Sequence, residues 1–78
     1  SLERLEAEGF AVIQGEPQRG DMILMQIRSP VANHAGVYLG DGKMLHHMHG
    51  RLSETVVYGG MWAERTRHIV RHKEAGHD

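Results

Sequence analysis

Histidines at both ends of one short segment are the residues of this sequence best suited to chemistry. The segment NHAGVYLGDGKMLHH, residues 33–47, has His34 near its start and the adjacent His46 and His47 at its end. An imidazole changes charge near neutral pH and serves as a base, an acid or a metal ligand. Gly-Asp-Gly in the middle of the segment predicts a hairpin turn between two strands. Such a hairpin brings His34 toward the other two histidines, so we interpret them as a candidate site.

The register of the hairpin decides which histidine meets His34, because side chains alternate between the two faces of a strand. A two-residue loop places His34 on the face of His47. A three-residue loop, residues 40–42, places it on the face of His46 and sets Gly36 opposite His46. The glycine that ends residues 40–42 suits a type I turn followed by a left-handed residue, which favours the longer loop. We predict that His34 pairs with His46, and the shorter loop stays open as the alternative.

Two more residues share the predicted face with His34. Gly36 follows it by two positions, and a glycine inside a strand often marks the close approach of another group. That group is a substrate or a second side chain. Tyr38 lies two positions further and is suited to line a substrate groove, with simple packing as the alternative. We therefore take Gly36 and Tyr38 as candidate substrate-binding residues.

The lack of cysteine limits this chemistry. Neither a disulfide nor a thiolate zinc site is possible within these residues, and two imidazoles need a nucleophile to act on. Ser29 and Ser53 lie in no G-x-S-x-G motif. The His-His-x-His pattern of His46, His47 and His49 lacks the usual spacing of a zinc site. We expect no metal and no cofactor, although a histidine-rich metal-binding module stays open.

The bulk composition argues against several broad functions. The chain has 78 residues and a net charge of -1 with its histidines neutral. It is one domain or part of one, without the basic stripe of a nucleic-acid-binding protein. No apolar run reaches the about 18 residues of a membrane span, and no signal peptide is visible. We expect no nucleic-acid partner and no membrane span.

The elements that position the hairpin are short. Residues 1–9 are typical of a helix end closed by Gly9, and the apolar run at residues 21–27 is typical of a strand buried on both faces. Consecutive strands with short loops favour an antiparallel sheet. We predict an α+β fold, a short N-terminal helix with a four- to five-stranded antiparallel sheet or partial barrel. Outside the hairpin we also expect an extended piece at 11–13, an ambiguous segment at 51–65, a last strand at 65–73 and a frayed tail at 74–78.

Charged residues outside the hairpin have structural interpretations. Asp21 stands at a strand start and is typical of a residue that bonds a turn or loop. Arg65, Arg67 and Arg71 alternate along the last predicted strand and indicate a solvated face, with a partner surface as the second interpretation.

The hairpin resembles the HxGIYxGxGxxxH hairpin of the NlpC-type cell-wall peptidases, a papain-like family of cysteine hydrolases. The preceding GDMILM, residues 20–25, resembles the strand that leads into that hairpin. The resemblance extends over nearly the whole chain and is strongest to the members found in tail tips of lambda-like phages. The matching pieces are residues 5–9, Gly20-Asp21, Pro30, Asn33-His34-Ala35, Tyr38, Gly40-Asp41-Gly42, Leu45-His46-His47, Leu52-Ser53, Tyr58, Trp62 and Arg71-His72.

The resemblance implies roles for the histidines. His34 would be the general base that activates a cysteine, and His46 would orient His34. His47 would point to the opposite face. The substrates implied are peptidoglycan stem peptides, cut at a γ-D-glutamyl–diamino-acid bond. The site implied is a virion tail tip, made in the host cytoplasm and acting at the bacterial cell envelope.

One departure from the family pattern is decisive. The family's cysteine lies in an Asp-Cys motif at a helix start upstream of the hairpin, and nothing in this sequence matches it. We therefore expect residues 1–78 to be a partial NlpC-type domain, the β half without the cysteine-bearing half, and inactive alone. It would be a fragment or the remnant of a truncated gene.

This incomplete domain has consequences for partners. An apolar sheet face left uncovered invites association, so we expect the missing half, other tail-tip proteins, or a second copy in a homodimer or exchanged dimer. A non-catalytic module for tail assembly is the alternative function.

Overall fold

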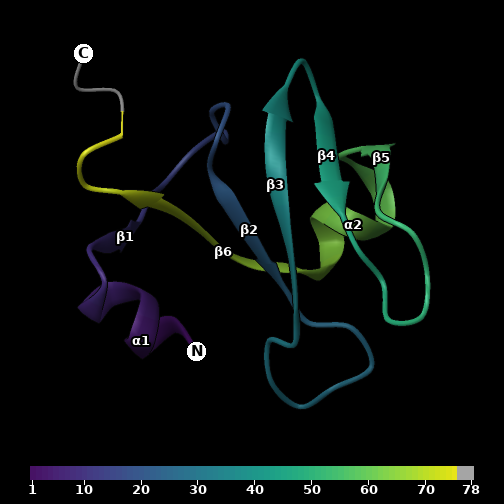
Figure 1. Cartoon of the computed structure of the whole chain (residues 1–78), viewed down its shortest axis with the longest axis horizontal. Coiled ribbons are helices and arrows are strands. Elements are labelled where there is room, and N and C mark those ends of the chain that lie inside the picture. Colours follow the sequence, from purple (N-terminus) through teal and green to yellow (C-terminus); the bar gives the residue numbers. More distant parts are fainter. Residues whose placement is uncertain (76–78) are drawn as a thin grey trace.

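The fold consists of two short helices and six strands in a computed structural model that describes residues 1–75 (Figure 1). Part of the tail expected at 74–78 therefore lies outside the described residues. In chain order the elements are α1 (Leu2–Ala7), β1 (Phe10–Val12), β2 (Met22–Met25), β3 (His34–Gly40), β4 (Lys43–His46), β5 (Glu54–Val57), α2 (Gly60–Arg65) and β6 (Thr66–His72). None of the helices is long and apolar enough to cross a membrane among these described residues.

All six strands form one antiparallel sheet with the order β1-β6-β2-β3-β4-β5. The predicted α+β class, with a short N-terminal helix and an antiparallel sheet, is confirmed. The sheet has one strand more than the upper expectation, because β5 lies in the segment that the sequence left ambiguous. The last strand, β6, lies between the first two, which leaves the apolar β2 with a neighbour on each side and explains its burial.

The β3–β4 hairpin has the predicted register, but its turn has a different form. Gly36 pairs with His46, as the longer loop required. The turn itself contains only Asp41 and Gly42, which have φ values of 51° and 74°. Positive φ at both positions is the signature of a type I′ turn, the tightest hairpin connection. A bulge before Gly40 shifts the pairing by one residue, and this shift restores the predicted register.

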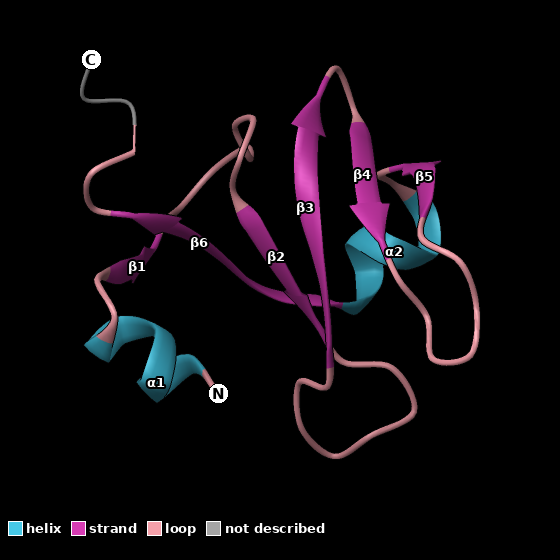
Figure 2. Ribbon diagram, in the orientation of Figure 1, coloured by secondary structure: helices cyan, strands magenta, loops and turns pink. Residues whose placement is uncertain are grey.

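One face of the sheet, which we call the core face, holds the hydrophobic core. The two helices lie at opposite ends of the sheet, α1 beside β1 and α2 behind β4 (Figure 2). The core therefore forms where α2 and the end of β5 fold over the middle strands. Its fully buried members are Ile23, Met25 and Met44, and Ile27, Tyr38, Val56, Tyr58 and Trp62 pack against them.

The opposite face, which we call the open face, leaves apolar side chains in contact with solvent. Val12, Val37 and Leu45 lie in one row across the sheet, because the strand pairings connect them through Val70 and Met22. Each of the three is 38–39% exposed. The hairpin thus carries its histidine pair on the core face, and its other face is part of an uncovered apolar surface.

Candidate active site at the His34–His46 pair

The imidazoles of His34 and His46 are in hydrogen-bonding contact. His34 begins β3 and His46 ends β4, so the antiparallel pairing brings the two rings to the same end of the hairpin. His34 Nε2 lies 3.0 Å from His46 Nδ1, with the rings edge to face at 82°. One of these two nitrogens has to donate the proton and the other has to accept it. The outer nitrogens, His34 Nδ1 and His46 Nε2, are then left for other partners.

An aromatic side chain from α2 covers the pair. The ring centroid of Trp62 lies 4.5 Å from that of His46 and 6.4 Å from that of His34. Thr66 anchors the helix end, since its hydroxyl donates to the Trp62 carbonyl oxygen at 2.8 Å and lies 2.6 Å from the Tyr58 hydroxyl. Side chains packed in this way limit the rotamers of both imidazoles, which a catalytic pair requires.

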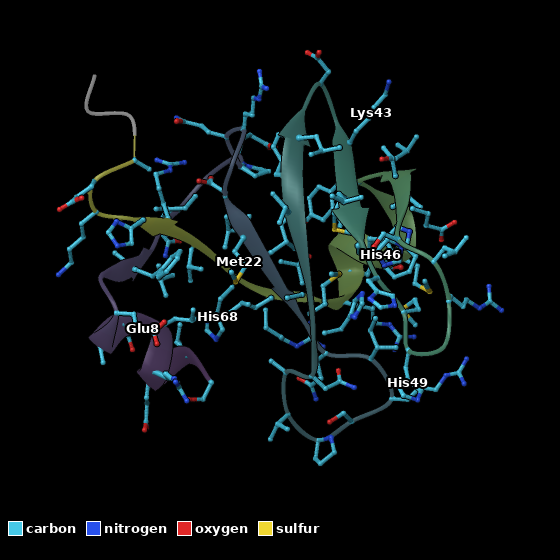
Figure 3. The ribbon with its side chains drawn as sticks, viewed as in Figure 1. Glu8, Met22, Lys43, His46, His49 and His68 are labelled. Carbon is cyan, nitrogen blue, oxygen red and sulfur yellow. The ribbon has the colours of Figure 1, made fainter. Side chains whose placement is uncertain are left out.

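His46 is buried and only partly satisfied. It is 3% exposed and projects from β4 toward α2 (Figure 3). Its Nε2 is buried without a hydrogen-bond partner among residues 1–75. The carboxylate oxygen Oε1 of Glu54 lies 3.4 Å away, close enough for an ion pair but outside hydrogen-bond geometry. Sequence reasoning missed Glu54, and the only signal for it was the strand that places it opposite His46.

His34 is held in its neutral form. Burial, followed by the nearby imidazoles of His46 and His47, lowers the pKa of His34 below its usual 6.5. A neutral imidazole at pH 7 has a free lone pair and is able to accept a proton. Within the described residues His34 Nδ1 makes no hydrogen bond, so it is the nitrogen open to an incoming group.

Two openings lead to His34. A groove of about 600 Å³ on the α1 side is lined mostly by apolar side chains, among them Leu2, Leu5 and Leu24. His68 lies in the same groove, near α1 in Figure 3. A smaller cavity of about 310 Å³ is lined by His34 together with Ile27, Arg28, Asn33, Met48 and His49. His34 therefore stands where solvent, a substrate or another polypeptide segment has access.

Asn33 fixes the backbone beside His34. Its side-chain Oδ1 accepts from the Ile27 N–H and its Nδ2 donates to the Ile27 carbonyl, both at 2.8 Å. The Asn33 N–H also donates to the Met25 carbonyl at 2.9 Å. These bonds tie the loop before β3 to the end of β2, so the backbone position of His34 is set from the β2 side.

Gly36 and Tyr38 lie on the core face with His34, as the register requires. A Cβ at Gly36 would lie 2.5 Å from Met44 Sδ, so the close approach at this glycine is made by the protein's own core. The hydroxyl of Tyr38 accepts from the Gly42 N–H at 2.8 Å and thereby holds the turn. Both residues have structural contacts that account for them, and their part in substrate binding stays a prediction.

The remaining histidines of the hairpin do not join the pair. His47 follows His46 directly, lies on the exposed side and lines a different, shallow cavity. His49 lies in the loop after β4 (Figure 3). Over residues 1–75, no group of three or more His, Asp or Glu side chains is placed to hold a metal ion. The metal-binding alternative gains no support from this geometry.

Known proteins share this sequence pattern over most of the chain. Tail tip assembly protein K of Escherichia phage N15 is 48% identical over 66 residues, which are 85% of this chain and 27% of that protein. Tail tip assembly protein K of Escherichia phage lambda is 41% identical over 73 residues, which are 92% of this chain and 37% of that protein. The chain thus spans between a quarter and two fifths of the length of these relatives.

The family assignment rests on a match of nearly the full length. No solved structure matches the chain. The model of the NlpC/P60 family, in contrast, matches residues 2–71, which include His34, His46 and all six strands except His72, the last residue of β6. The chain belongs to the NlpC/P60 family.

Proposed function

We propose that this chain supplies the base and the orienting residue of a cysteine peptidase, while the nucleophilic thiol comes from another polypeptide segment. The observation that carries the proposal is the 3.0 Å contact between His34 Nε2 and His46 Nδ1. In a relay of nucleophile, base and orienting group, the base uses one ring nitrogen toward the nucleophile and the other toward the orienting group. His34 has one nitrogen bonded to His46 and the other without a partner among residues 1–75, which fits the middle position.

The reaction follows from these positions. His34 Nδ1 takes the proton of the incoming thiol, and the sulfur attacks the carbonyl carbon of the scissile amide. The C–N bond then breaks as the imidazolium returns its proton to the leaving amine. Water, deprotonated by His34, hydrolyses the thioester and releases the acid and the thiol. His46 touches no reacting atom and keeps the ring of His34 in place.

The groove on the α1 side is suited to receive the segment that carries the thiol. It is about 600 Å³ in volume, and His34 is one of the residues that line it. Its walls from α1 and β2 are apolar, so an amphipathic segment would bury its apolar side there. A thiol near the end of such a segment would then lie close to His34.

The relatives suggest a setting for this chemistry. Both matched proteins are named tail tip assembly proteins of phages. We propose that the protein to which this chain belongs is part of a tail tip and interacts with other tail proteins. Its substrate would be a peptidoglycan stem peptide, cut at the γ-D-glutamyl–diamino-acid bond at the cell envelope. Local cleavage of the wall would then aid DNA entry.

The test supplies the missing thiol. The chain is joined to the segment that precedes the aligned region in the phage N15 relative, and hydrolysis of a synthetic stem peptide is followed by mass spectrometry. We expect hydrolysis by the joined protein, none by the chain alone, and a loss of about 10³-fold or more with His34→Ala, as for removal of a catalytic base.

A matched histidine provides the control. His47→Ala removes an imidazole from the same hairpin but from its exposed side. It should change the rate less than about threefold, because burial and His46 lower the pKa of His34 more than His47 does. A joined protein that hydrolyses the peptide equally well with His34→Ala would contradict the proposal.

A second function, a non-catalytic interaction module, is favoured by the open face. Val12, Val37 and Leu45 form a row of half-exposed apolar side chains, and such patches mark association sites. We expect the isolated chain to form a homodimer or an exchanged dimer in light scattering, and Val37→Asn to weaken it. A monomer at high concentration contradicts this expectation.

A further inference from the structure

The outer nitrogen of His46 faces a carboxylate that the peptidase assignment does not use. Glu54 starts β5 and pairs directly with His46 across the β4–β5 ladder. Its Oε1 lies 3.4 Å from His46 Nε2, a ring nitrogen that is buried and has no hydrogen-bond partner in the described part of the chain. The backbone register therefore delivers one negative group to the only free polar atom of a buried imidazole.

The contact limits where the protons of the histidine pair reside. If Nε2 of His46 lacked a proton, its lone pair would point at a carboxylate oxygen, and both groups would be acceptors without a donor. If Nε2 carries the proton, it has an acceptor within a small side-chain movement. The partner on one ring nitrogen thus decides the protonation of the other, and the Glu54 carboxylate favours N–H at Nε2.

The proton then follows a single direction through the pair. With Nε2 protonated, His46 Nδ1 is an acceptor and has to take the proton of His34 Nε2 across the 3.0 Å contact. His34 Nδ1 is consequently left with its lone pair. The reverse direction, with His46 Nδ1 donating, would place a proton on His34 Nδ1 and block it as a base.

We propose that Glu54 is a positioning residue that sets this direction and keeps His34 Nδ1 unprotonated. The inference rests on the peptidase assignment of His34 and His46 and names a side chain that acts on His46, outside the relay of thiol, His34 and His46. Glu54 touches no reacting atom, and its effect reaches the reaction only through the two imidazoles.

Glu54 makes few contacts that would give it a structural role. Its side chain is 60% exposed, and its contact with His46 is the one ion pair it makes among residues 1–75. A residue with that exposure contributes little to the packing of the core, so its substitution leaves the fold intact. This makes the positioning role separable from a structural one.

The test reads the protons directly. The 78-residue chain is labelled with ¹⁵N, and the ring nitrogens of His34 and His46 are observed by NMR at about pH 8, above the usual imidazole pKa. We expect N–H at Nε2 of both rings in the unaltered chain. Glu54→Ala should raise the fraction of His34 that carries its proton on Nδ1 by about tenfold, because the carboxylate 3.4 Å away no longer favours a proton on His46 Nε2.

Two variants separate positioning from other effects. The amide oxygen introduced by Glu54→Gln is also an acceptor for an Nε2–H group, so this change should keep most of the original proton pattern. Glu64→Ala removes an exposed carboxylate from α2 and should leave the pattern and the backbone spectrum unchanged. The proposal is overturned if Glu54→Ala keeps the original pattern, or if the unaltered chain already carries the proton on His34 Nδ1.

An activity measurement keeps this inference apart from the peptidase assignment. In the protein joined to the thiol-bearing segment, Glu54→Ala should lower kcat roughly 10- to 100-fold with KM nearly unchanged, as for other outer partners of functional histidines. Shifted protons without any hydrolysis in the joined protein would refute the peptidase assignment alone. If the joined protein hydrolyses the peptide and Glu54→Ala leaves kcat unchanged, the role of Glu54 alone is refuted.

Discussion

Two buried polar groups on the core face, Asp21 and His46, differ in how their hydrogen bonds are completed. Asp21 is 2% exposed, and its carboxylate accepts from Arg71 Nε and Nη2 and from the Gln18 N–H, each at 2.8 Å. His46 is 3% exposed and has one ring nitrogen bonded and the other without a hydrogen bond in the described chain. Both carboxylate oxygens of Asp21 therefore accept hydrogen bonds, whereas only one of the two ring nitrogens of His46 is hydrogen-bonded among residues 1–75.

The difference separates a structural polar site from a chemical one. A buried group left without a partner costs about 1–3 kcal/mol, so folded proteins rarely keep one without a use. The Asp21–Arg71 pair holds the start of β2 against β6 and has no capacity left for a ligand. The His34–His46 pair leaves two ring nitrogens without a hydrogen bond over residues 1–75, which is the state a proton relay needs. Satisfaction of hydrogen bonds, more than burial or charge, distinguishes the two regions.

The largest effect is expected when the Asp21–Arg71 pair is broken. Asp21→Ala leaves the Arg71 guanidinium partly buried without its carboxylate, and we expect a loss of about 3–5 kcal/mol in the free energy of unfolding. A chain of this size has only roughly 4–12 kcal/mol in total, so the loss is a large fraction of its stability. Urea denaturation followed by circular dichroism measures the loss.

The matched control replaces both partners. The double variant Asp21→Leu with Arg71→Met removes the charges together and should recover a large part of the lost stability, since no charge is left unpaired. If Asp21→Ala alone costs less than about 1 kcal/mol, the pair is not the structural tie that its geometry indicates.

The next largest effect is expected at Trp62, which covers the His34–His46 pair. Trp62→Ala removes the ring that lies 4.5 Å from His46, and should cost about 2–3 kcal/mol, below the range of a fully buried tryptophan. It should also broaden the imidazole NMR signals of His46, because the ring gains room to move. Met61→Ala, an exposed neighbour in α2, should change stability by less than about 0.5 kcal/mol. Sharp His46 signals after Trp62→Ala would contradict this role.

A smaller effect on stability is expected at the His34–His46 pair itself. His46→Leu removes the unsatisfied nitrogen and keeps an apolar side chain of similar size, so the free energy of unfolding should change by no more than about 1 kcal/mol in either direction. His34 is partly exposed and can bond water in place of His46. A loss above about 3 kcal/mol would show that the histidine pair is a structural site like the Asp21–Arg71 pair, and the comparison would fail.

The sequence predicted one of these two regions and not the other, and the distances along the chain explain why. The contact of His34 with His46 follows from strand alternation and one turn, which are local features, although the turn reached this register through a bulge at Gly40. The Asp21–Arg71 pair joins residues 50 positions apart, and no local pattern indicates it. The interpretation of Arg71 as part of a solvated face with Arg65 and Arg67 was wrong for this reason.

Glu54 was missed because its strand was missed. The segment before α2 carries a serine and two adjacent glycines, which masked the strand Glu54–Val57. Its pairing with β4 is visible only once the whole sheet is assembled. Nonlocal strand pairing therefore brings Arg71 to Asp21 and also places Glu54 beside His46.

The smallest effect, the dependence of stability on pH, tests both regions in one experiment. His34 has a pKa below its usual 6.5 in the folded chain because burial and then His46 and His47 disfavour its charged form. Between that lowered pKa and 6.5 the unfolded chain binds more protons, so His34 contributes stability that is present above pH 6.5 and lost as the pH falls through its folded pKa.

Asp21 acts in a separate range of pH. Burial alone would raise its pKa, but the hydrogen bonds from Arg71 and the Gln18 N–H outweigh burial and lower the pKa below 3.8. Its contribution is therefore present above pH 3.8 and lost as the pH falls through the lower, folded pKa.

Free energies of unfolding measured from about pH 8 downward for the unaltered chain and for His34→Gln separate the two contributions, because six histidines and Asp21 are common to both proteins. We expect the slope just below pH 6.5 to be shallower in His34→Gln and the loss below pH 3.8 to be the same in both. Equal slopes below pH 6.5 would mean that His34 is as free to take up a proton in the folded chain as in the unfolded one. The His34–His46 pair would then lack the neutral imidazole on which its proposed chemistry depends.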